Sequence, residues 1–168
     1  MKINNINSAF LLLGSNMGNR EEFLNKAIEL IDKQAGFIKK KSSLYNTAAW
    51  GKNDQNDFLN QVVLIETNST AQKLLSTILK IEQTLGRKRN EKWAERTIDI
   101  DILYFNRDIL NSKTLTVPHP LIQDRRFALL PLSEIAPNYL HPVLHKNARE
   151  LLKVCKDKLE VRKLTKSL

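Results

Sequence analysis

Apolar residues along the chain follow two different periods, which predict strands in some segments and helices in others. The run 8–13 (SAFLLL) is almost continuously apolar and ends at Gly14, a pattern typical of a short buried strand. The segments 37–45 and 57–67 also predict strands, the first with a lysine-rich outer face. The segment 96–105 (RTIDIDILYF) alternates between polar and apolar residues, which predicts a strand with two chemically distinct faces.

Two segments carry apolar residues three or four positions apart, as amphipathic helices do. The first spans residues 19–34 and the second spans residues 69–85. Ser69, followed by Gln72 three positions later, has the spacing of a capping box and predicts the start of the second helix. Together with the strands, these helices give the order β-α-β-β-α-β, which is the ferredoxin-like arrangement of an α+β sandwich.

The rest of the chain is expected to add helices to this sandwich. The proline-bearing segment 117–120 (VPHP) is followed by a short helix that ends near Ile135. A final amphipathic helix is expected to begin near Asn147, which predicts a basic helical tail over about 147–168. Because no repeat or low-complexity linker divides the chain, we expect a single domain over residues 1–168 with a C-terminal helical extension.

Composition narrows the expected location of the protein. The 168 residues include one cysteine, Cys155, which excludes an internal disulfide and fits a reducing compartment. No apolar run approaches the roughly 20 residues that span a membrane, and residues 1–8 lack an apolar signal core. We therefore expect a cytoplasmic protein that makes no membrane contact.

The net charge of +9 is concentrated in two places. Residues 86–96 hold five Lys/Arg against two Glu, and residues 143–168 hold eight Lys/Arg against three Asp/Glu. A basic patch indicates a phosphate-bearing partner, which is either a nucleic acid or a nucleotide. For the tail, a solvated surface is the preferred explanation of the charge.

The strongest chemical signal is Asp99-Ile100-Asp101. Side chains alternate across a strand, so the two aspartates share one face, roughly 7 Å apart. Two carboxylates completed by substrate phosphates are what Mg²⁺ prefers, and two metal ions can clamp a phosphoryl transfer between them. The alternative is an exposed strand face with two solvated acids.

Basic residues directly before this strand favour the metal interpretation. Three of them are Arg87, Arg89 and Arg96. A guanidinium group can bond two phosphate oxygens at once and stays charged. Glu82, one helical turn earlier, is either an acceptor for an adenosine hydroxyl, an anchor for a loop arginine, or an ordinary helix-edge residue. His119 lies between two prolines, which stiffen its backbone. It is either a phosphate contact or a structural histidine.

Aromatic residues near polar loops could stack a flat heterocycle. The candidates are Trp50, Phe58, Trp93 and Phe127. Phe58 and Asn60 share one side of their strand, and an Asn amide offers the donor and acceptor that match the edge of a pterin or purine ring. Core packing is the alternative for each aromatic residue. The segment 14–19 lacks the Lys-Ser/Thr of a phosphate-binding loop and predicts a plain strand-to-helix turn.

Taken together, these residues resemble the 6-hydroxymethyl-7,8-dihydropterin pyrophosphokinase family. The matching segments run in the order LLLGSNMGNR, SSLYNTAAWG, NDFLNQVVLIET, IEQTLGRKRNEKWAERTIDIDILYF, LTVPHP and RRFALLPLSEIAP, and span about residues 11–142. The chain departs from the family pattern at Leu79, where some members place a glutamine, and at Ala48-Ala49, where many carry prolines.

The resemblance implies the reaction, the ligands and the site residues. ATP would transfer a pyrophosphoryl group to the pterin hydroxymethyl oxygen, with AMP as the leaving group. Two Mg²⁺ would bind Asp99 and Asp101, and the catalytic set would be Asp99, Asp101, Arg87, Arg89 and Arg96. ATP would contact Glu82, Arg87, Arg89, Trp93, Arg96, Ile102, Thr116, His119 and Arg125. The pterin would contact Thr47, Ala48, Trp50, Phe58, Asn60, Trp93, Asp99 and Phe127.

Two other classes of protein remain open on the residues alone. A metal-dependent nucleotidyl transferase also uses paired acids and two metals, and would release pyrophosphate from ATP. An RNA-recognition module shares the β-α-β-β-α-β order, but the segment 57–67 lacks the glycine and the basic residue of its third-strand motif. We expect a monomeric enzyme that binds no nucleic acid.

Overall fold

The computed structural model describes residues 6–48, 55–88 and 95–165. A six-stranded sheet consists of β1 (Asn7–Ser15), β2 (Phe37–Lys41), β3 (Tyr45–Thr47), β4 (Phe58–Thr67), β5 (Asp99–Phe105) and β8 (Val161–Lys163). A separate two-stranded sheet consists of β6 (Leu110–Asn111) and β7 (Thr116–Val117). The helices are α1 (Arg20–Gln34), α2 (Ala71–Thr84), α3 (Arg126–Ile135) and α4 (Ala148–Val154), with a short 3-10 helix at Ile122–Asp124.

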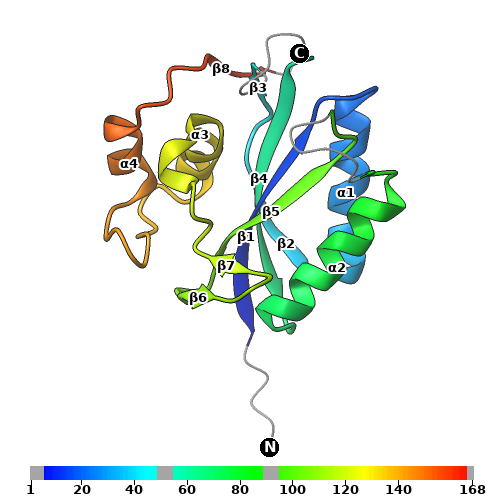
Figure 1. Cartoon of the computed structure of the whole chain (residues 1–168), viewed down its shortest axis with the longest axis horizontal. Helices are drawn as coiled ribbons and strands as arrows, with labels where there is room; N and C mark the ends of the chain where they lie inside the picture. Colours follow the sequence, from blue (N-terminus) through cyan, green and yellow to red (C-terminus); the bar gives the residue numbers. More distant parts are fainter. Residues whose placement is uncertain (1–5, 49–54, 89–94, 166–168) are drawn as a thin grey trace, which may run out of the picture.

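The large sheet is antiparallel and has the strand order β5-β1-β4-β3-β8, with β2 also paired to β4. Figure 1 shows α1 and α2 on one face of this sheet, and α3 and α4 on the other. The chain is therefore a mixed α/β fold with helices on both faces of an antiparallel sheet.

Covering both faces explains why the first strand is continuously apolar. Leu11 and Leu13 belong to the core beneath α1 and α2, whereas Phe10 and Leu12 belong to the core beneath α3 and α4. A strand buried on both faces needs apolar residues at every position rather than at alternate ones. Strand β1 lies between β5 and β4, the two strands that carry Asp99, Asp101, Phe58 and Asn60.

Three predicted elements differ in the structure. The single strand expected over 37–45 is divided into β2 and β3, because Ser42 between them bonds Val62 with both its N–H and its hydroxyl oxygen. The second helix is capped by Thr70, whose hydroxyl accepts from the Lys73 N–H at 3.3 Å, so the capping box at Ser69 was wrong by one residue.

The helical tail expected over about 147–168 is the third difference. Helix α4 begins after Asn147 as expected, with a capping box to Glu150, but it ends at Val154. Cys155 takes an extended backbone, and the chain then adds β8 to the edge of β3. An edge strand offers unpaired backbone groups, so pairing there satisfies this segment better than continued helix does.

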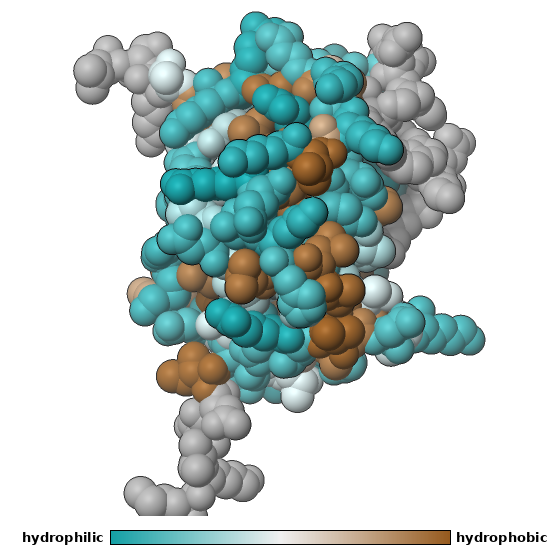
Figure 2. Space-filling view, turned by 90° about the vertical axis from the view of Figure 1, so that its left-hand side faces the viewer, coloured by the Kyte–Doolittle hydropathy of each residue, from teal (hydrophilic) through white to brown (hydrophobic). Residues whose placement is uncertain are grey.

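The surface over α3 and α4 is mostly hydrophilic, with apolar side chains in separate patches (Figure 2). Lys153 in the last turn of α4, and Lys156 and Lys158 in the segment after it, are exposed, as expected for a solvated basic tail. Within residues 6–48, 55–88 and 95–165, no helix is both long and apolar enough to cross a membrane.

Candidate active site

The two aspartates lie on β5, and both face the same side of the sheet toward two neighbouring cavities. Asp99 pairs with Gly14 of β1, and Asp101 pairs with Leu12, so both acids lie beside β1. Ile100 between them is 4% exposed and belongs to the core on the opposite face. The alternating sequence therefore places the carboxylates as predicted.

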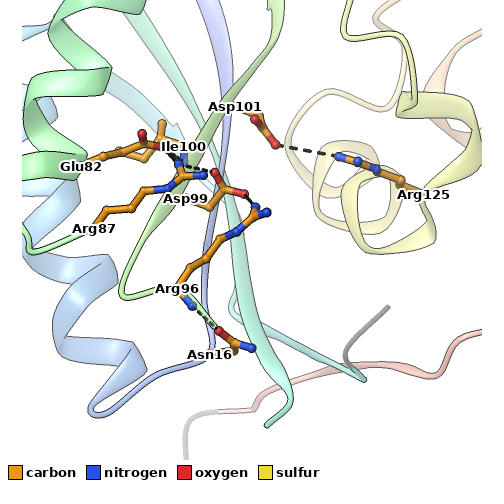
Figure 3. Close-up of polar contacts among 8 residues, drawn as sticks. All are labelled: Asn16, Glu82, Arg87, Arg96, Asp99, Ile100, Asp101 and Arg125. Carbon is orange, nitrogen blue, oxygen red and sulfur yellow. Dashed lines mark hydrogen bonds and ion pairs between the residues drawn. The ribbon is translucent and has the colours of Figure 1, made fainter. Parts of the chain in front are cut away.

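Glu82 anchors an arginine against the first aspartate (Figure 3). Its carboxylate, 2% exposed, accepts the Ile100 N–H at 2.8 Å and also accepts a hydrogen bond from Arg87. Arg87 Nη1 in turn lies 2.6 Å from Asp99 Oδ1. Of the interpretations open for Glu82, the structure supports the anchor for a loop arginine.

A glycine directs Arg87 toward the acids. Helix α2 ends at Thr84, and Gly86 takes a φ of 82°, a left-handed conformation that glycine adopts without strain. The Arg87 N–H then donates to the Glu82 carbonyl at 3.0 Å, which closes the end of the helix. The sequence signal for this turn is the Gly86-Arg87 pair directly after the helix.

Arg96 is held at both its side chain and its backbone. Its guanidinium bonds Asp99 Oδ2. Its backbone N–H donates to Asn16 Oδ1 at 2.8 Å, and its carbonyl accepts the Asn16 N–H at 3.1 Å (Figure 3). Asn16 is fully buried, and its amide also donates to the Asn56 carbonyl at 3.4 Å. Sequence analysis treated the turn 14–19 as a plain connection and missed this residue.

Arg125 approaches the second aspartate from the opposite side. It lies at the N-terminus of α3, with Nη1 3.8 Å from Asp101 Oδ2, and its guanidinium stands over the Phe127 ring at 5.7 Å from the centroid. Burial and the nearby charge of Asp99 raise the pKa of Asp101 to about 7, and the cation of Arg125 offsets only part of this. The positive charge around Asp101 is thus too small to hold its carboxyl group fully ionised near pH 7.

This donor set fits a divalent cation. In the described part of the chain, no group of three or more His, Cys, Asp or Glu side chains is placed to hold a metal ion. Mg²⁺, however, needs only one or two carboxylates when phosphates and water complete its shell. Two oxygen-donor side chains on one strand face, one of them short of positive charge, meet that requirement.

Two cavities meet at the acids. The smaller, of about 90 Å³, lies toward β3 and the start of α3, and the larger, of about 440 Å³, lies between α2 and the β7 region. Four charged residues line both cavities, namely Arg96, Asp99, Asp101 and Arg125. A group bound in one cavity therefore reaches the other directly across the carboxylates.

The smaller cavity brings together residues expected to hold a pterin. Phe58, Phe127, Thr47 and Asn60 all line it. Asn60 is 3% exposed, and its Nδ2 donates to Thr47 Oγ1 at 3.1 Å, which orients the amide. Ala48 also lines this cavity, whereas Trp50 lies outside the described residues.

Gly14 forms part of the wall of the smaller cavity, and sequence analysis missed it as well. A Cβ added at Gly14 would stand 2.8 Å from Asn60 Oδ1. The absence of a side chain at this position of β1 therefore makes room for the Asn60 amide.

The larger cavity brings together residues expected to hold ATP. Its lining includes Glu82, Arg87, Arg96, Ile102, Thr116, His119 and Arg125. Burial, and then the charge of Arg125, lower the pKa of His119 to about 4, so this side chain is neutral near pH 7. Its Nδ1 accepts the Leu121 N–H at 3.1 Å, which leaves Nε2 to carry the proton and to act as a donor. Arg89 and Trp93 lie outside the described residues.

Comparison with known proteins identifies relatives over most of the chain. Residues 10–137 match the family model described as "7,8-dihydro-6-hydroxymethylpterin-pyrophosphokinase (HPPK)". A relative from Aquifex aeolicus named "2-amino-4-hydroxy-6-hydroxymethyldihydropteridine pyrophosphokinase" is 42% identical over 143 residues, covering 85% of this chain and 89% of the relative. A relative of the same name from Bacillus subtilis is 44% identical over 130 residues, covering 77% and 78%.

Solved structures share the fold. A crystal structure of Plasmodium falciparum HPPK-DHPS matches with a TM-score of 0.77 at 22% identity, covering 91% of this chain and 45% of that chain. This chain thus spans less than half of the longer Plasmodium chain, and the likeness at that identity concerns the fold alone. The family match and the identity to the bacterial relatives show that the chain belongs to the 7,8-dihydro-6-hydroxymethylpterin-pyrophosphokinase family.

Proposed function

We propose that this chain transfers a pyrophosphoryl group from ATP to the hydroxymethyl oxygen of 6-hydroxymethyl-7,8-dihydropterin, a step of folate biosynthesis. The products are AMP and the pterin diphosphate. One observation carries the proposal: Asp99 and Asp101 stand where an apolar-walled cavity and an arginine-lined cavity meet. Family membership then selects this reaction among those that paired acids support.

The smaller cavity takes the pterin. Phe58 and Phe127 stack on the two faces of the ring, and Asn60 reads its edge as donor and acceptor. The hydrogen bond from Asn60 to Thr47 supports this role, because it fixes the amide before the ligand arrives. The hydroxymethyl group then extends toward the aspartates that line the same cavity.

The larger cavity takes ATP. Arg87, Arg96 and Arg125 supply positive charge along the triphosphate, and the neutral His119 donates from Nε2. Phosphoryl transfer is catalysed mainly by positioning and by neutralising charge, so a site of acids, metal and arginines needs no strong base. Arg89 and Trp93 complete this set in the proposal.

Asp99 and Asp101 hold the metal, for which we propose two Mg²⁺ per site. Bound there, the metal supplies Lewis-acid neutralisation of the phosphate oxygens. The two carboxylates, fixed on a single strand, keep the phosphate chain and the pterin hydroxyl in line. The new O–P bond would form at the β-phosphorus as the bond from that phosphorus to the oxygen shared with the α-phosphate breaks. AMP would leave with that oxygen, and the hydroxyl proton would pass to water.

The strand order β5-β1-β4-β3, with β2 also on β4, supports the ferredoxin-like interpretation of the fold. In this order β5 neighbours β1, so the acids come to face the residues of β4 across one strand. Cytoplasmic location, a monomeric state, a single domain and the absence of nucleic-acid binding remain predictions from the sequence.

Product analysis tests the proposal. The protein is incubated with ATP, Mg²⁺ and 6-hydroxymethyl-7,8-dihydropterin, and the products are separated by anion-exchange chromatography. Equal amounts of AMP and pterin diphosphate are expected, with neither product formed when EDTA removes the metal. ADP with a pterin monophosphate would indicate an ordinary kinase, and free pyrophosphate would indicate a nucleotidyl transferase.

A further inference from the structure

The segment 155–165 follows α4 and lies beyond residues 10–137, which match the family model. Figure 1 shows it running from α4, past α3, to the edge of the sheet at β3. Helix α3 and strand β3 carry opposite parts of the smaller cavity, with Phe127 on the first and Thr47 on the second. One segment of chain therefore touches both supports of this cavity.

At α3, the segment supplies a missing helix cap. The N-cap residue of α3 is Arg125, whose side chain makes no capping hydrogen bond and instead extends toward Asp101. The N–H of Arg126, the first residue of the helix, donates to Asp157 Oδ2 at 3.0 Å. Helices usually place Ser, Thr, Asp or Asn at the N-cap itself, so an aspartate 31 residues away performs that task here.

At β3, the same segment adds a strand. Thr47 pairs with Val161 and Tyr45 pairs with Lys163, and the Leu164 N–H donates to the Leu44 carbonyl at 2.8 Å. Thr47 is buried beneath this pairing and is the acceptor that orients Asn60. The segment thereby fixes the backbone of the second support as well.

We propose that Asp157 is a positioning residue for the pterin. By accepting the first N–H of α3, it fixes the turn that carries Arg125 and Phe127, and so leaves the Arg125 side chain available to the acids. The inference rests on the proposed function, because it takes the smaller cavity as the pterin site.

The physical reason is the state of the helix end without the cap. An unpaired N–H and a lost negative charge at the N-terminus favour fraying of the first turn, and Phe127 is the second residue of that turn. Glu82 and Arg87 lie on the other side of the acids, at the end of α2, where they are held by their own ion pair. Arg125, at the N-cap, is one of three cations that the structure describes in the proposed ATP site, whereas Phe127 is one of only two rings proposed to stack on the pterin. Loss of the cap should therefore weaken pterin binding more than ATP binding.

Calorimetry on the full chain tests the inference. The pterin is titrated into protein saturated with Mg²⁺ and a non-hydrolysable ATP analogue, and the analogue is titrated separately. Asp157→Ala should weaken pterin binding on the order of five-fold, the size of a typical cap, and leave analogue affinity within about two-fold. Asp157→Asn should lose less pterin affinity, since its amide oxygen can still accept the Arg126 N–H. Glu160→Ala is the control, because it removes only an exposed ion pair with Arg162 in the same segment.

A second background separates capping from general stability. Proline lacks the N–H that Asp157 accepts and is favoured at the first position of a helix. In an Arg126→Pro background, adding Asp157→Ala should therefore leave pterin affinity unchanged. A further loss in that background, or an equal loss of pterin and analogue affinity with a lower melting temperature, would overturn the positioning role.

The outcomes distinguish the two proposals. If the wild-type protein binds pterin, and Asp157→Ala and Asp157→Asn bind it equally well, the inference fails while the proposed function stands. If Asp157→Ala does not fold, Asp157→Asn decides the same question. If the wild-type protein binds no pterin with the analogue present, the proposed function fails and the inference fails with it.

Discussion

Replacing Gly14 with alanine should damage the pterin site more than the fold. An added Cβ would stand 2.8 Å from Asn60 Oδ1, whereas ordinary contact begins near 3.4 Å, so the amide must move by about 0.6 Å. The Asn60 amide bonds Thr47 at 3.1 Å and is almost fully buried, so a shift of that size breaks the bond or turns the amide from the cavity.

The magnitude follows from the groups involved. A buried neutral hydrogen bond contributes about 0.5–1.5 kcal/mol, and loss of the oriented ring-edge contact costs a similar amount, which corresponds to a roughly five-fold weaker affinity for the pterin. Alanine in a strand regains about 0.5–1 kcal/mol relative to glycine, so the global stability should change little. Affinity and stability should therefore separate.

Calorimetry with the pterin in the presence of an ATP analogue measures the first quantity, and thermal unfolding measures the second. Gly36→Ala is the matched control. Its Cβ would stand 2.4 Å from the Glu66 carbonyl oxygen, outside the residues that line either cavity. This variant should lower the melting temperature and leave pterin affinity intact at temperatures where it is folded. A folded Gly14→Ala protein with wild-type pterin affinity would refute the reasoning.

Three further substitutions test the charges around the site. Asp101→Asn should reduce turnover by about 100-fold or more, because an amide is a poor Mg²⁺ ligand. Since the pKa of Asp101 is raised to about 7, the stability of the wild-type fold should fall as the pH rises from about 4 to 7. The variant should therefore melt at a higher temperature than wild type at pH 8 without metal. Glu82→Gln should weaken binding of the ATP analogue several-fold and lower the free energy of unfolding by about 1–2 kcal/mol, because Arg87 loses a charged partner. Unchanged affinity for the analogue would contradict the anchor role. Burial alone would raise the pKa of Glu134, but hydrogen bonds, the first from Tyr45, hold this pKa below 4.5. The contribution of Glu134 to stability is therefore present above pH 4.5 and is lost as the pH falls. In Glu134→Gln, the free energy of unfolding should depend less steeply on pH below 4.5, which acid unfolding curves measure.

Strands β1, β4 and β5 were predictable because periodicity fixes which face a side chain takes. The alternation around Ile100 was enough to place both aspartates on one face, and the uniform apolar run of β1 followed from helices on both faces. The tail was not predictable in the same way. The spacing of Leu151, Leu152 and Cys155 fits a helix, and only the free edge of β3 explains why the chain becomes extended instead.

The candidate site residues also divide into those that a local sequence pattern marks and those that no local pattern marks. Residues whose chemistry is unusual for their place, such as paired acids or an arginine cluster, stand out in the sequence as candidates. Asn16 could not, because its task is to hold the backbone of Arg96, 80 positions away, and nothing local signals that contact. Asp157 is similar, since a capping aspartate is expected next to the helix that it caps. Residues that act through a distant backbone group leave no local pattern.

The charges of the site explain why ATP and metal would enter together. Three carboxylates, from Glu82, Asp99 and Asp101, lie among three arginines, and Asp99 alone pairs with two of them. Counted as ionised, this cluster is already neutral, so a triphosphate alone would add uncompensated negative charge near the acids. Divalent cations alone would add uncompensated positive charge near the arginines.

Two divalent cations carry as much positive charge as a fully ionised ATP carries negative charge, so the complex adds no net charge to the cluster. Under the proposed function, the carboxylates would exchange arginine for metal, and Arg87 and Arg96 would exchange Asp99 for phosphate oxygens. Each group would gain a partner of the same sign as the one that it gives up, so the bound complex would leave no buried charge of this cluster unpaired. The ion pairs around Asp99 thus hold Arg87 and Arg96 beside the proposed triphosphate site before the substrate arrives.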